Sequence, residues 1–477
     1  MATEPNNTHP DAHTPLLVGW ASADVTPDQP VFLRGQFHAR VSTHVQDPLT
    51  VTALALESAG DQAVMVSCDR CTIEEGLLDE CREALRDAAS DLDGAKVFAG
   101  ATHTHTAPEA QPRDWPDPDK PVMDGPEYRP VLVQGIVFAV VEAWRGRRPG
   151  GVSWALGHAV VGHNRRTSYL DGEARMYGST DDAQFAGMEG YEDHSADLLF
   201  TWTPAGDLTG VVVNLACPSQ VTEGDLFVSA DFWHETRVEL RKRLGADLFV
   251  LPQCAPAGDQ SPHLLLHQAG EARMRDLRGV TEREEIGLRI ADAVERVLPY
   301  ARADIRGAVP LRHEVRALGL TRRRITEAAL EEAKRGEAED LARYERLRHE
   351  SPDNYTAISG AFGHARWYSN VQERFRLQTE QPTYPVELHV VRLGDVAFAT
   401  NPFELFLDFG LRMKARSRAV QTFCVQLVGS GTYVPTERAV TGKSYGAEAA
   451  SNAVGPEGGQ ELVEATVALL EELWADG

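Results

Sequence analysis

The sequence has few cysteines, and they form no recognisable disulfide framework. Six cysteines are scattered over 477 residues, a usage that fits reduced thiols and a cytoplasmic location. Cys68 and Cys71 match the C-x-x-C spacing of metal and redox sites. They lack a second such pair and follow an apolar run, so we interpret them as part of a buried strand rather than as a metal or redox motif.

Long apolar runs are also missing. No stretch approaches the roughly 20 uninterrupted apolar residues that span a bilayer, so we expect no stable membrane insertion. Residues 1–14 have neither the basic nor the apolar region of a secretory signal. We expect them to form a disordered polar tail ahead of a globular domain.

Positive charge is scarce as well. The chain has 47 basic and 71 acidic side chains, which gives a formal net charge of −24. Such a charge opposes phosphate backbones and anionic membrane surfaces. We therefore expect a small-molecule substrate rather than nucleic acid, and the sequence leaves homo-oligomerisation open.

Repeats, low-complexity tracts and long linkers are absent from the sequence, which argues against a string of independent modules. Short apolar runs alternate instead with helix-like segments. The expected strands are residues 51–58, 63–68, 96–102, 208–217, 248–254, 386–400 and 422–430. The expected helices are residues 73–90, 231–245, 281–298 and 459–475. This alternation predicts an α/β protein with mixed internal sheets covered by helices.

Two further segments stand out by composition. Residues 321–350 are rich in helix formers with opposite charges three or four positions apart, as in an exposed helix. We expect a solvated helical insertion or lid without a catalytic residue, and the nearby residues His364, Arg366 and Trp367 could face a substrate. Residues 107–130, with seven prolines, predict a long ordered loop.

The sharpest local signal is a pair of histidines directly after a predicted strand. His103 and His105 alternate with threonines in the segment 100–109. In an extended chain, residues two apart point the same way, so both imidazoles would project together. One could bind a metal while the other donates to a substrate, and two hydrogen-bonded structural histidines remain the alternative.

Two other turns after apolar strands carry polar groups. Ser261 lies in the Gly- and Pro-bounded turn 257–263, but the chain has no G-x-S-x-G elbow, so the α/β-hydrolase nucleophile is not indicated. Glu404 follows the apolar segment 396–400 near the start of a predicted helix. It could interact with the helix dipole or serve as an oxygen ligand for zinc.

Taken in order along the chain, these blocks resemble the catalytic domain of the neutral/alkaline ceramidase family. The matching blocks are residues 19–27, 47–49, 102–109, 164–170, 258–263, 402–404 and 432–436. Each block is short, but together they cover nearly the whole chain. The resemblance implies one ceramidase-like hydrolase domain at residues 15–477, without the C-terminal immunoglobulin-like domain of the extracellular relatives.

The resemblance also implies one zinc ion per chain. Its ligands at matching positions would be His103, Cys217, Glu404 and Tyr433. Cys217 departs from the pattern, because the family has a histidine there. A thiolate is an excellent zinc ligand, although another divalent metal, or loss of the metal, is also compatible. Further candidates for a missing ligand are His105, Asp231 and His234.

In the scheme that the resemblance implies, a metal-activated water attacks the carbonyl of a linear amide. Tyr433 and His105 would donate hydrogen bonds to the developing oxyanion, and His105 would protonate the leaving amine. Arg165 would hold a substrate oxygen. Ser261 would face the substrate either as a nucleophile or as a group that orients the carbonyl.

Three alternatives stay open beside the amidase. The same metal site could serve an ester or lactone, Cys217 could record a binding protein that has lost its metal, or Cys217 could itself be a nucleophile. Ceramide is disfavoured as the substrate, because the chain lacks the secretion signal and the additional domain of the extracellular enzymes. A smaller, polar amide fits better.

Overall fold

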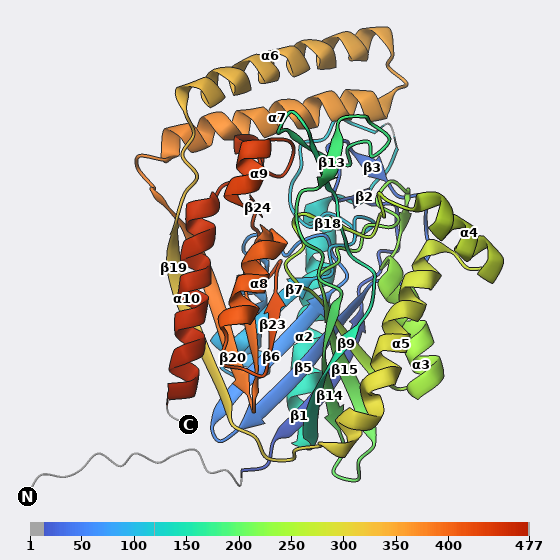
Figure 1. Ribbon diagram of the computed structural model, residues 1–477, viewed down its shortest axis with the longest axis vertical. Coiled ribbons are helices and arrows are strands. Elements are labelled where there is room, and N and C mark those ends of the chain that lie inside the picture. Colours follow the sequence, from blue (N-terminus) through green and yellow to red (C-terminus); the bar gives the residue numbers. More distant parts are fainter. Residues whose placement is uncertain (1–13, 119, 476–477) are drawn as a thin grey trace, which may run out of the picture.

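Three mixed sheets form the centre of the fold (Figure 1). The computed structural model describes residues 14–118 and 120–475, so the tail predicted at residues 1–14 lies outside them except for its last residue. Each of the three sheets combines antiparallel pairs with one parallel pair. The predicted α/β class with mixed internal sheets is confirmed.

The order of strands within each sheet shows where the parallel pairs lie. The first sheet runs β7 (Val97–Ala101), β6 (Asp61–Cys68), β5 (Thr50–Ser58), β1 (Leu17–Asp24) and β8 (Arg148–Pro149). The second runs β17 (Phe249–Cys254), β15 (Leu208–Leu215), β14 (Ser195–Trp202) and β9 (Gly151–His158). The third runs β19 (Leu311–Thr321), β20 (Thr383–Leu393), β21 (Val396–Thr400) and β23 (Gln421–Val425). In each sheet the parallel pair lies at one edge, as β6/β7, β15/β17 and β21/β23.

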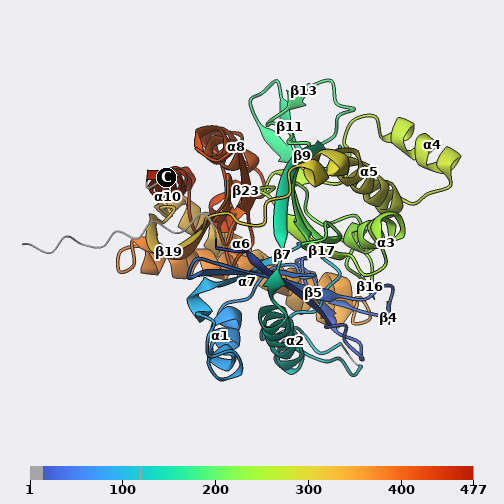
Figure 2. The ribbon, with the colours of Figure 1, turned by 90° about the horizontal axis from the view of Figure 1, so that it is seen from below.

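Helices cover the outer face of each sheet (Figure 2). The first sheet packs against α1 (Leu77–Ala88) and α2 (Gly125–Arg145), the second against α3 (Phe232–Leu244) and α5 (Glu282–Ala303), and the third against α8 (Leu407–Arg416) and α10 (Pro456–Ala475). Two further helices are α4 (Gln268–Arg278) and α9 (Glu437–Gly442). The remaining strands are β2 (Phe32–Leu33), β3 (Arg40–Val41), β4 (His44–Val45), β10 (His163–Asn164), β11 (Arg166–Tyr169), β12 (Ala174–Met176), β13 (Phe185–Met188), β16 (Phe227–Val228), β18 (Gln260–Ser261), β22 (Glu404–Leu405) and β24 (Tyr433–Val434).

The inner faces of the three sheets meet in a shared core. Along β5, Leu54 and Leu56 point to this core, whereas Ala53 and Ala55 point to the helices. Both faces are buried, which is why the strand reads as a nearly continuous apolar run. Phe398 and Phe423 stack in the third sheet with ring centroids 4.4 Å apart. This core fixes the strand ends relative to one another.

Helix α2 replaces the last part of the loop predicted at residues 107–130. The helix begins after Asp124, whose side chain accepts from the backbone N–H of Glu127, while the Glu127 side chain accepts in return from Asp124. Pro126 lies in the first turn, where a backbone N–H has no helical partner in any case. Pro126 therefore marks the start of a helix, although a segment with seven prolines predicts a loop.

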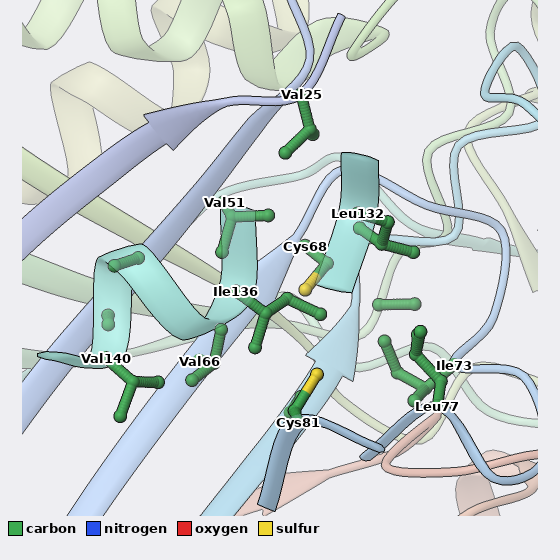
Figure 3. Packing of buried hydrophobic residues seen from close by; sticks show 14 of the residues in the cluster. Val25, Val51, Val66, Cys68, Ile73, Leu77, Cys81, Leu132, Ile136 and Val140 are labelled. Carbon is green, nitrogen blue, oxygen red and sulfur yellow. The ribbon is translucent and has the colours of Figure 1, made fainter. Parts of the chain in front are cut away.

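Buried aliphatic side chains hold α2 to the first sheet (Figure 3). Leu132, Ile136 and Val140 of α2 lie in one cluster with residues of β5 and β6. Cys68 and Cys81 are fully buried in the same cluster. Burial raises the pKa of the Cys68 thiol far above its usual value, so Cys68 behaves as a small apolar residue.

Two long helices form a hairpin across one end of the molecule (Figure 1). They are α6 (Glu327–Glu350) and α7 (Tyr355–Leu377). The charged segment predicted as an exposed helix corresponds to α6, in which only Leu330 and Ala333 are buried. No helix among the described residues is both long and apolar enough to cross a bilayer.

A buried pair of histidines joins β19 to β20 of the third sheet and to β6 of the first sheet. His313 Nδ1 donates to the Gln62 carbonyl at 3.0 Å, and His313 Nε2 lies 3.0 Å from His389 Nδ1. Burial, together with the nearby His389, lowers the pKa of His313 to about 3. The folded protein therefore holds His313 neutral at pH values where an unfolded chain would protonate it.

We predict that this histidine makes the fold sensitive to mild acid. Below an unfolded pKa of 6.5, the unfolded state binds a proton that the folded state refuses until its own pKa of about 3, so stability falls as the pH falls through this window. Between pH 7 and pH 5 the loss from one such group is about 2 kcal/mol. In urea titrations, His313→Asn should lose correspondingly less stability over this interval. His349→Asn, at an exposed position of α6, should behave like the wild type, and equal losses in all three proteins would contradict the prediction.

Candidate active site

A cavity of about 720 Å³ opens at the end of the sheets beneath α7. Its lining includes residues that lie two to five positions beyond the ends of strands of all three sheets. Cys71 follows β6, His103 follows β7, Gln220 follows β15 and Glu404 follows β21. The carboxyl ends of parallel strands thus meet at one place, which is where α/β sheets commonly bind ligands.

His103 is held by the pairing of β6 and β7, which continues beyond the strand ends. Thr102 and Thr104 donate their backbone N–H groups to the carbonyls of Cys68 and Arg70. Between them, His103 adopts a left-handed backbone with φ 66° and places Nδ1 2.7 Å from the Cys71 carbonyl. A carbonyl can only accept, so Nδ1 carries the hydrogen and Nε2 presents its lone pair to the cavity.

The structure brings His105 and Glu404 to the same nitrogen. His105 Nε2 and Glu404 Oε2 each lie 3.4 Å from His103 Nε2. The threonines of this segment point the other way, because Thr104 and Thr106 both donate their hydroxyls to the Ser229 carbonyl. The predicted joint projection of the two imidazoles is therefore present in the fold.

The lone pair of the second imidazole is already used in a hydrogen bond. The Gln220 amide nitrogen lies 2.8 Å from His105 Nε2 and donates to it. His105 Nδ1 is buried without a hydrogen-bond partner among residues 14–118 and 120–475. The Glu223 carboxylate faces it at 3.7 Å. Of the two histidines, only His103 thus combines a hydrogen-bonded Nδ1 with an Nε2 lone pair that faces the cavity.

The charges at this group are strongly coupled. Burial alone would lower the pKa of His103, but Cys71 and Glu404 outweigh it and raise that pKa well above its usual value. Burial and the charge on His103 lower the pKa of His105 well below its usual value. Burial would raise the pKa of Glu404, but His103 lowers it. The surroundings therefore favour one positive charge at His103 Nε2, which a proton or a metal ion can supply.

The arrangement of donors fits a divalent metal. The donor atoms of Cys71, His103 and His105 all lie within 4.8 Å of one another. In a tetrahedral site with metal bonds of about 2.0–2.1 Å, ligand atoms are about 3.3–3.4 Å apart. The two 3.4 Å separations at His103 Nε2 have this length. Hydrogen bonding of the outer ring nitrogen is the usual way in which a metal-binding histidine is oriented.

Tyr433 and Arg165 stand beside this group. Strand β24 pairs in parallel with β22, which places Tyr433 next to Glu404. Arg165 Nη2 donates to the Tyr433 hydroxyl at 3.2 Å and to the Gly258 carbonyl at 2.9 Å. Burial and the neighbouring Glu404 raise the pKa of Tyr433 well above its usual value. Arg165 thus orients a hydroxyl that stays protonated.

Ser261 is buried behind Tyr177. The Tyr177 hydroxyl, from a residue that lines the cavity, donates to Ser261 Oγ at 3.0 Å. The backbone N–H of His263 donates to the same oxygen at 3.0 Å. Tyr177 has a left-handed backbone, with φ 52°. Ser261 therefore supports the cavity wall through Tyr177.

Three sequence candidates lie elsewhere in the described chain. Cys217 donates its thiol to the Val161 carbonyl at 3.3 Å within the core of the second sheet, and burial raises its pKa well above the usual value. Asp231 caps α3 by accepting from the backbone N–H of Phe232 at 2.7 Å. His234 lies in the first turn of α3. These three residues do not line the cavity, and their contacts belong to the core of the second sheet and to the start of α3.

Several cavity residues carried no motif in the sequence. They are Arg34, Phe37, Trp115, Tyr177, Gln220, Glu223 and Tyr445. Cys71 had a signal, the C-x-x-C spacing, but its partner Cys68 lies in the aliphatic core, so the pair as such has no joint role. Position at a strand end, rather than spacing to a second cysteine, distinguishes Cys71.

Helix α7 supplies one wall of the cavity. Trp367 packs on Phe37 and Tyr445, with ring centroids 5.4 Å and 6.2 Å apart. His364 packs on Phe37 at 4.6 Å, and Arg366 lines the cavity. The predicted approach of this segment to the site is thus present. At Gly363, any side chain would overlap the Phe37 carbonyl.

Solved ceramidase structures are similar to this one. The neutral ceramidase from Pseudomonas aeruginosa matches with a TM-score of 0.70 and 17% sequence identity, over 96% of this chain and 75% of that chain. A structure described as a ceramidase complexed with C2 matches with a TM-score of 0.68 and 14% identity, over the same 96% and 75%. No protein-family model and no curated protein sequence matches. At these identities the likeness shows the fold alone, and at that level it confirms the resemblance read from the sequence.

We predict that the position of the His105 ring depends on the absence of a side chain at Gly35. Gly35 has φ 113°, and a Cβ there would overlap the His105 ring. Gly60 also has a positive φ, 86°, but no atom lies within 4 Å of its Cβ position. Gly60→Ala should therefore destabilise the fold by about 1 kcal/mol through backbone strain alone.

Gly35→Ala should lose a further 1–3 kcal/mol, roughly the range for overpacking, and should shift the His105 ring resonances in histidine NMR spectra. Urea denaturation of both variants measures the difference. Equal losses, with unchanged His105 resonances, would show that the ring does not lie against Gly35.

Proposed function

We propose that the protein is a metal-dependent hydrolase of a linear amide, with zinc as the metal. The observation that carries this proposal is that His105 Nε2 and Glu404 Oε2 each lie 3.4 Å from His103 Nε2, which belongs to the donor group of Cys71, His103 and His105. The fold shared with neutral ceramidases supports amide hydrolysis as the reaction class. The cavity then supplies a substrate site at these donors.

We assign His103 and Glu404 to the metal, with Cys71 and His105 as further donors within reach. Cys71 takes the role of sulfur ligand that the sequence resemblance gave to Cys217. When bound, zinc polarises a carbonyl and lowers the pKa of a bound water to about 7. Imidazole, carboxylate and thiolate together suit zinc better than magnesium or calcium.

The protein's own groups do the remaining work. The Tyr433 hydroxyl donates a hydrogen bond to the oxygen of the scissile carbonyl. This hydrogen bond becomes stronger as negative charge develops on that oxygen. Arg165 holds that hydroxyl in place and excludes other orientations. We assign the transfer of a proton to the leaving amine to His105, which would first take that proton from the attacking water, because its lowered pKa keeps the imidazole neutral.

Metal content tests the assignment of ligands. Protein purified without added metal should contain about one zinc per chain by elemental mass spectrometry, as expected for a single closed set of ligands. His103→Ala and Glu404→Ala should reduce this content. Cys71→Ala should reduce it too, whereas Cys217→Ala, the matched removal of a buried thiol from the second-sheet core, should not.

Two outcomes of this measurement would count against the proposal. Wild-type protein that takes up no zinc even when zinc is offered would exclude the metal site. Loss of zinc in Cys217→Ala, but not in Cys71→Ala, would return the sulfur ligand to Cys217. His105→Ala separates two roles, because retained zinc with lost hydrolysis assigns His105 to proton transfer.

Tyr433→Phe tests the hydroxyl. We expect kcat for amide hydrolysis to fall by about 10²–10³ while KM changes little, since the hydrogen bond strengthens only in the transition state. Steady-state kinetics at matched zinc content measure both constants. Tyr300→Phe, at an exposed position of α5, is the control. A Tyr433→Phe enzyme with wild-type kcat would remove Tyr433 from the chemistry.

A further inference from the structure

The charge balance of the cavity is opposite to that of the whole chain. The chain has 47 basic and 71 acidic side chains. The charged residues that line the cavity are Arg34, Arg113, Arg165 and Arg366 against Asp114, Glu223 and Glu404. A strongly acidic protein thus gathers arginines where a ligand would bind, and such a lining attracts anions.

Most of these arginines already have partners. Arg366 pairs with Asp114 at 2.8 Å. Arg113 pairs with the buried Glu109 at 3.3 Å. Arg165 is engaged by the Tyr433 hydroxyl and the backbone, as described above. Arg34 differs from all three.

The Arg34 guanidinium is the one that forms no hydrogen bond or ion pair in the described part of the chain, and its charge acts only at longer range on the buried Glu109 that Arg113 pairs with. Its Nη1 atom is buried and makes no hydrogen bond there, and the side chain forms no ion pair. An unpaired, partly buried cation is destabilising, and a bound anion would relieve this cost. A guanidinium offers a planar pair of donors that matches the two oxygens of a carboxylate.

The backbone of Arg34 is held beside the cavity. Its backbone N–H donates to the Ala107 carbonyl at 3.0 Å, and its carbonyl accepts from Arg40 Nη2 at 2.8 Å. The next residue, Gly35, lies directly against the His105 ring. The base of the side chain is therefore fixed beside the histidine group.

An apolar wall lies in the same cavity. Phe37, three residues after Arg34, packs against Trp367 and Tyr445, with ring centroids 5.4 Å and 5.6 Å apart. Together with Phe362 and Met176, these rings give the cavity an apolar surface. A ligand that combines one negative charge with an apolar group would use both features.

We infer that the substrate is an amide that carries a carboxylate next to an apolar group, as an N-acylated apolar amino acid does, and that Arg34 recognises the carboxylate. One carboxylate matches the one unpaired cation. Phe37, Trp367 and Tyr445 receive the apolar group. This inference rests on the proposed amide hydrolysis insofar as it calls the ligand a substrate. Recognition of the carboxylate by Arg34 does not depend on turnover.

Binding tests the recognition without any reaction. Hydrocinnamate and hydrocinnamyl alcohol have the same ring and chain length, and only the first carries a carboxylate. By calorimetry, wild-type protein should bind hydrocinnamate about tenfold more tightly or better, as expected for a charged hydrogen-bonded partner. Arg34→Gln should lose this preference, and Arg34→Lys should keep part of it. Arg376→Gln removes an exposed arginine from the same α7 that lines the cavity, and it should keep the wild-type preference.

Several results would overturn the inference. Equal affinity of wild-type protein for the two probes excludes carboxylate recognition. A preference that survives in Arg34→Gln assigns the carboxylate to another group, such as the metal. If Arg34→Gln fails to fold, as judged by its thermal transition, the wild-type comparison and Arg34→Lys still decide the question.

Hydrolysis of a second pair separates this inference from the proposed function. N-acetyl-phenylalanine and N-acetyl-phenethylamine share the ring and the scissile amide, and only the first carries a carboxylate. We expect kcat/KM to be at least about tenfold higher for the first. Equal hydrolysis of both would leave the proposed function intact and overturn the inference. Preferential binding of hydrocinnamate without hydrolysis of either amide would do the reverse.

Discussion

The hydrogen bond from His103 Nδ1 to the Cys71 carbonyl determines how the site is built. It joins the segments that follow β6 and β7, and it forces the His103 lone pair to face Glu404 and His105. The bond exists because the parallel register of these two strands brings their ends together. A shift of one residue in this register would bring other residues together at the strand ends and move His103 away from the Cys71 carbonyl. The geometry of the histidine group therefore depends on the register of β6 and β7, and on the core that fixes this register, as well as on the imidazoles.

Much of the fold could be predicted from the sequence, because strands that are buried on both faces form short continuous apolar runs. Runs such as 51–58 and 63–68 are apolar on both faces, since helices cover one side and the shared core the other. The start of helix α2 could not be predicted in this way, because the prolines near it are typical of a loop. Pro126 nevertheless occupies the first turn of the helix, which tolerates proline. Local composition could not distinguish these cases without the capping pair at Asp124 and Glu127.

The candidate site was predictable only where a chemical group lies at the end of an apolar run. His103, His105 and Glu404 have that position, and the fold brings them together. Asp47 belonged to a matching block too, yet it binds Ser229 and Arg283 and so has an architectural role. Arg34 and Tyr177 reach the cavity through turns and left-handed backbone, for which the sequence offers no period or spacing.

The hairpin of α6 and α7 builds part of the cavity from a separate stretch of the chain. The histidine group lies at strand ends, whereas α7 contributes a wall of the cavity and touches the Phe37 segment through Gly363. The hairpin is one contiguous stretch, so grafting it between proteins of this fold would exchange one wall of the cavity. Any graft would need a residue without a side chain opposite Phe37, so this single contact sets the compatibility rule for exchanging the module.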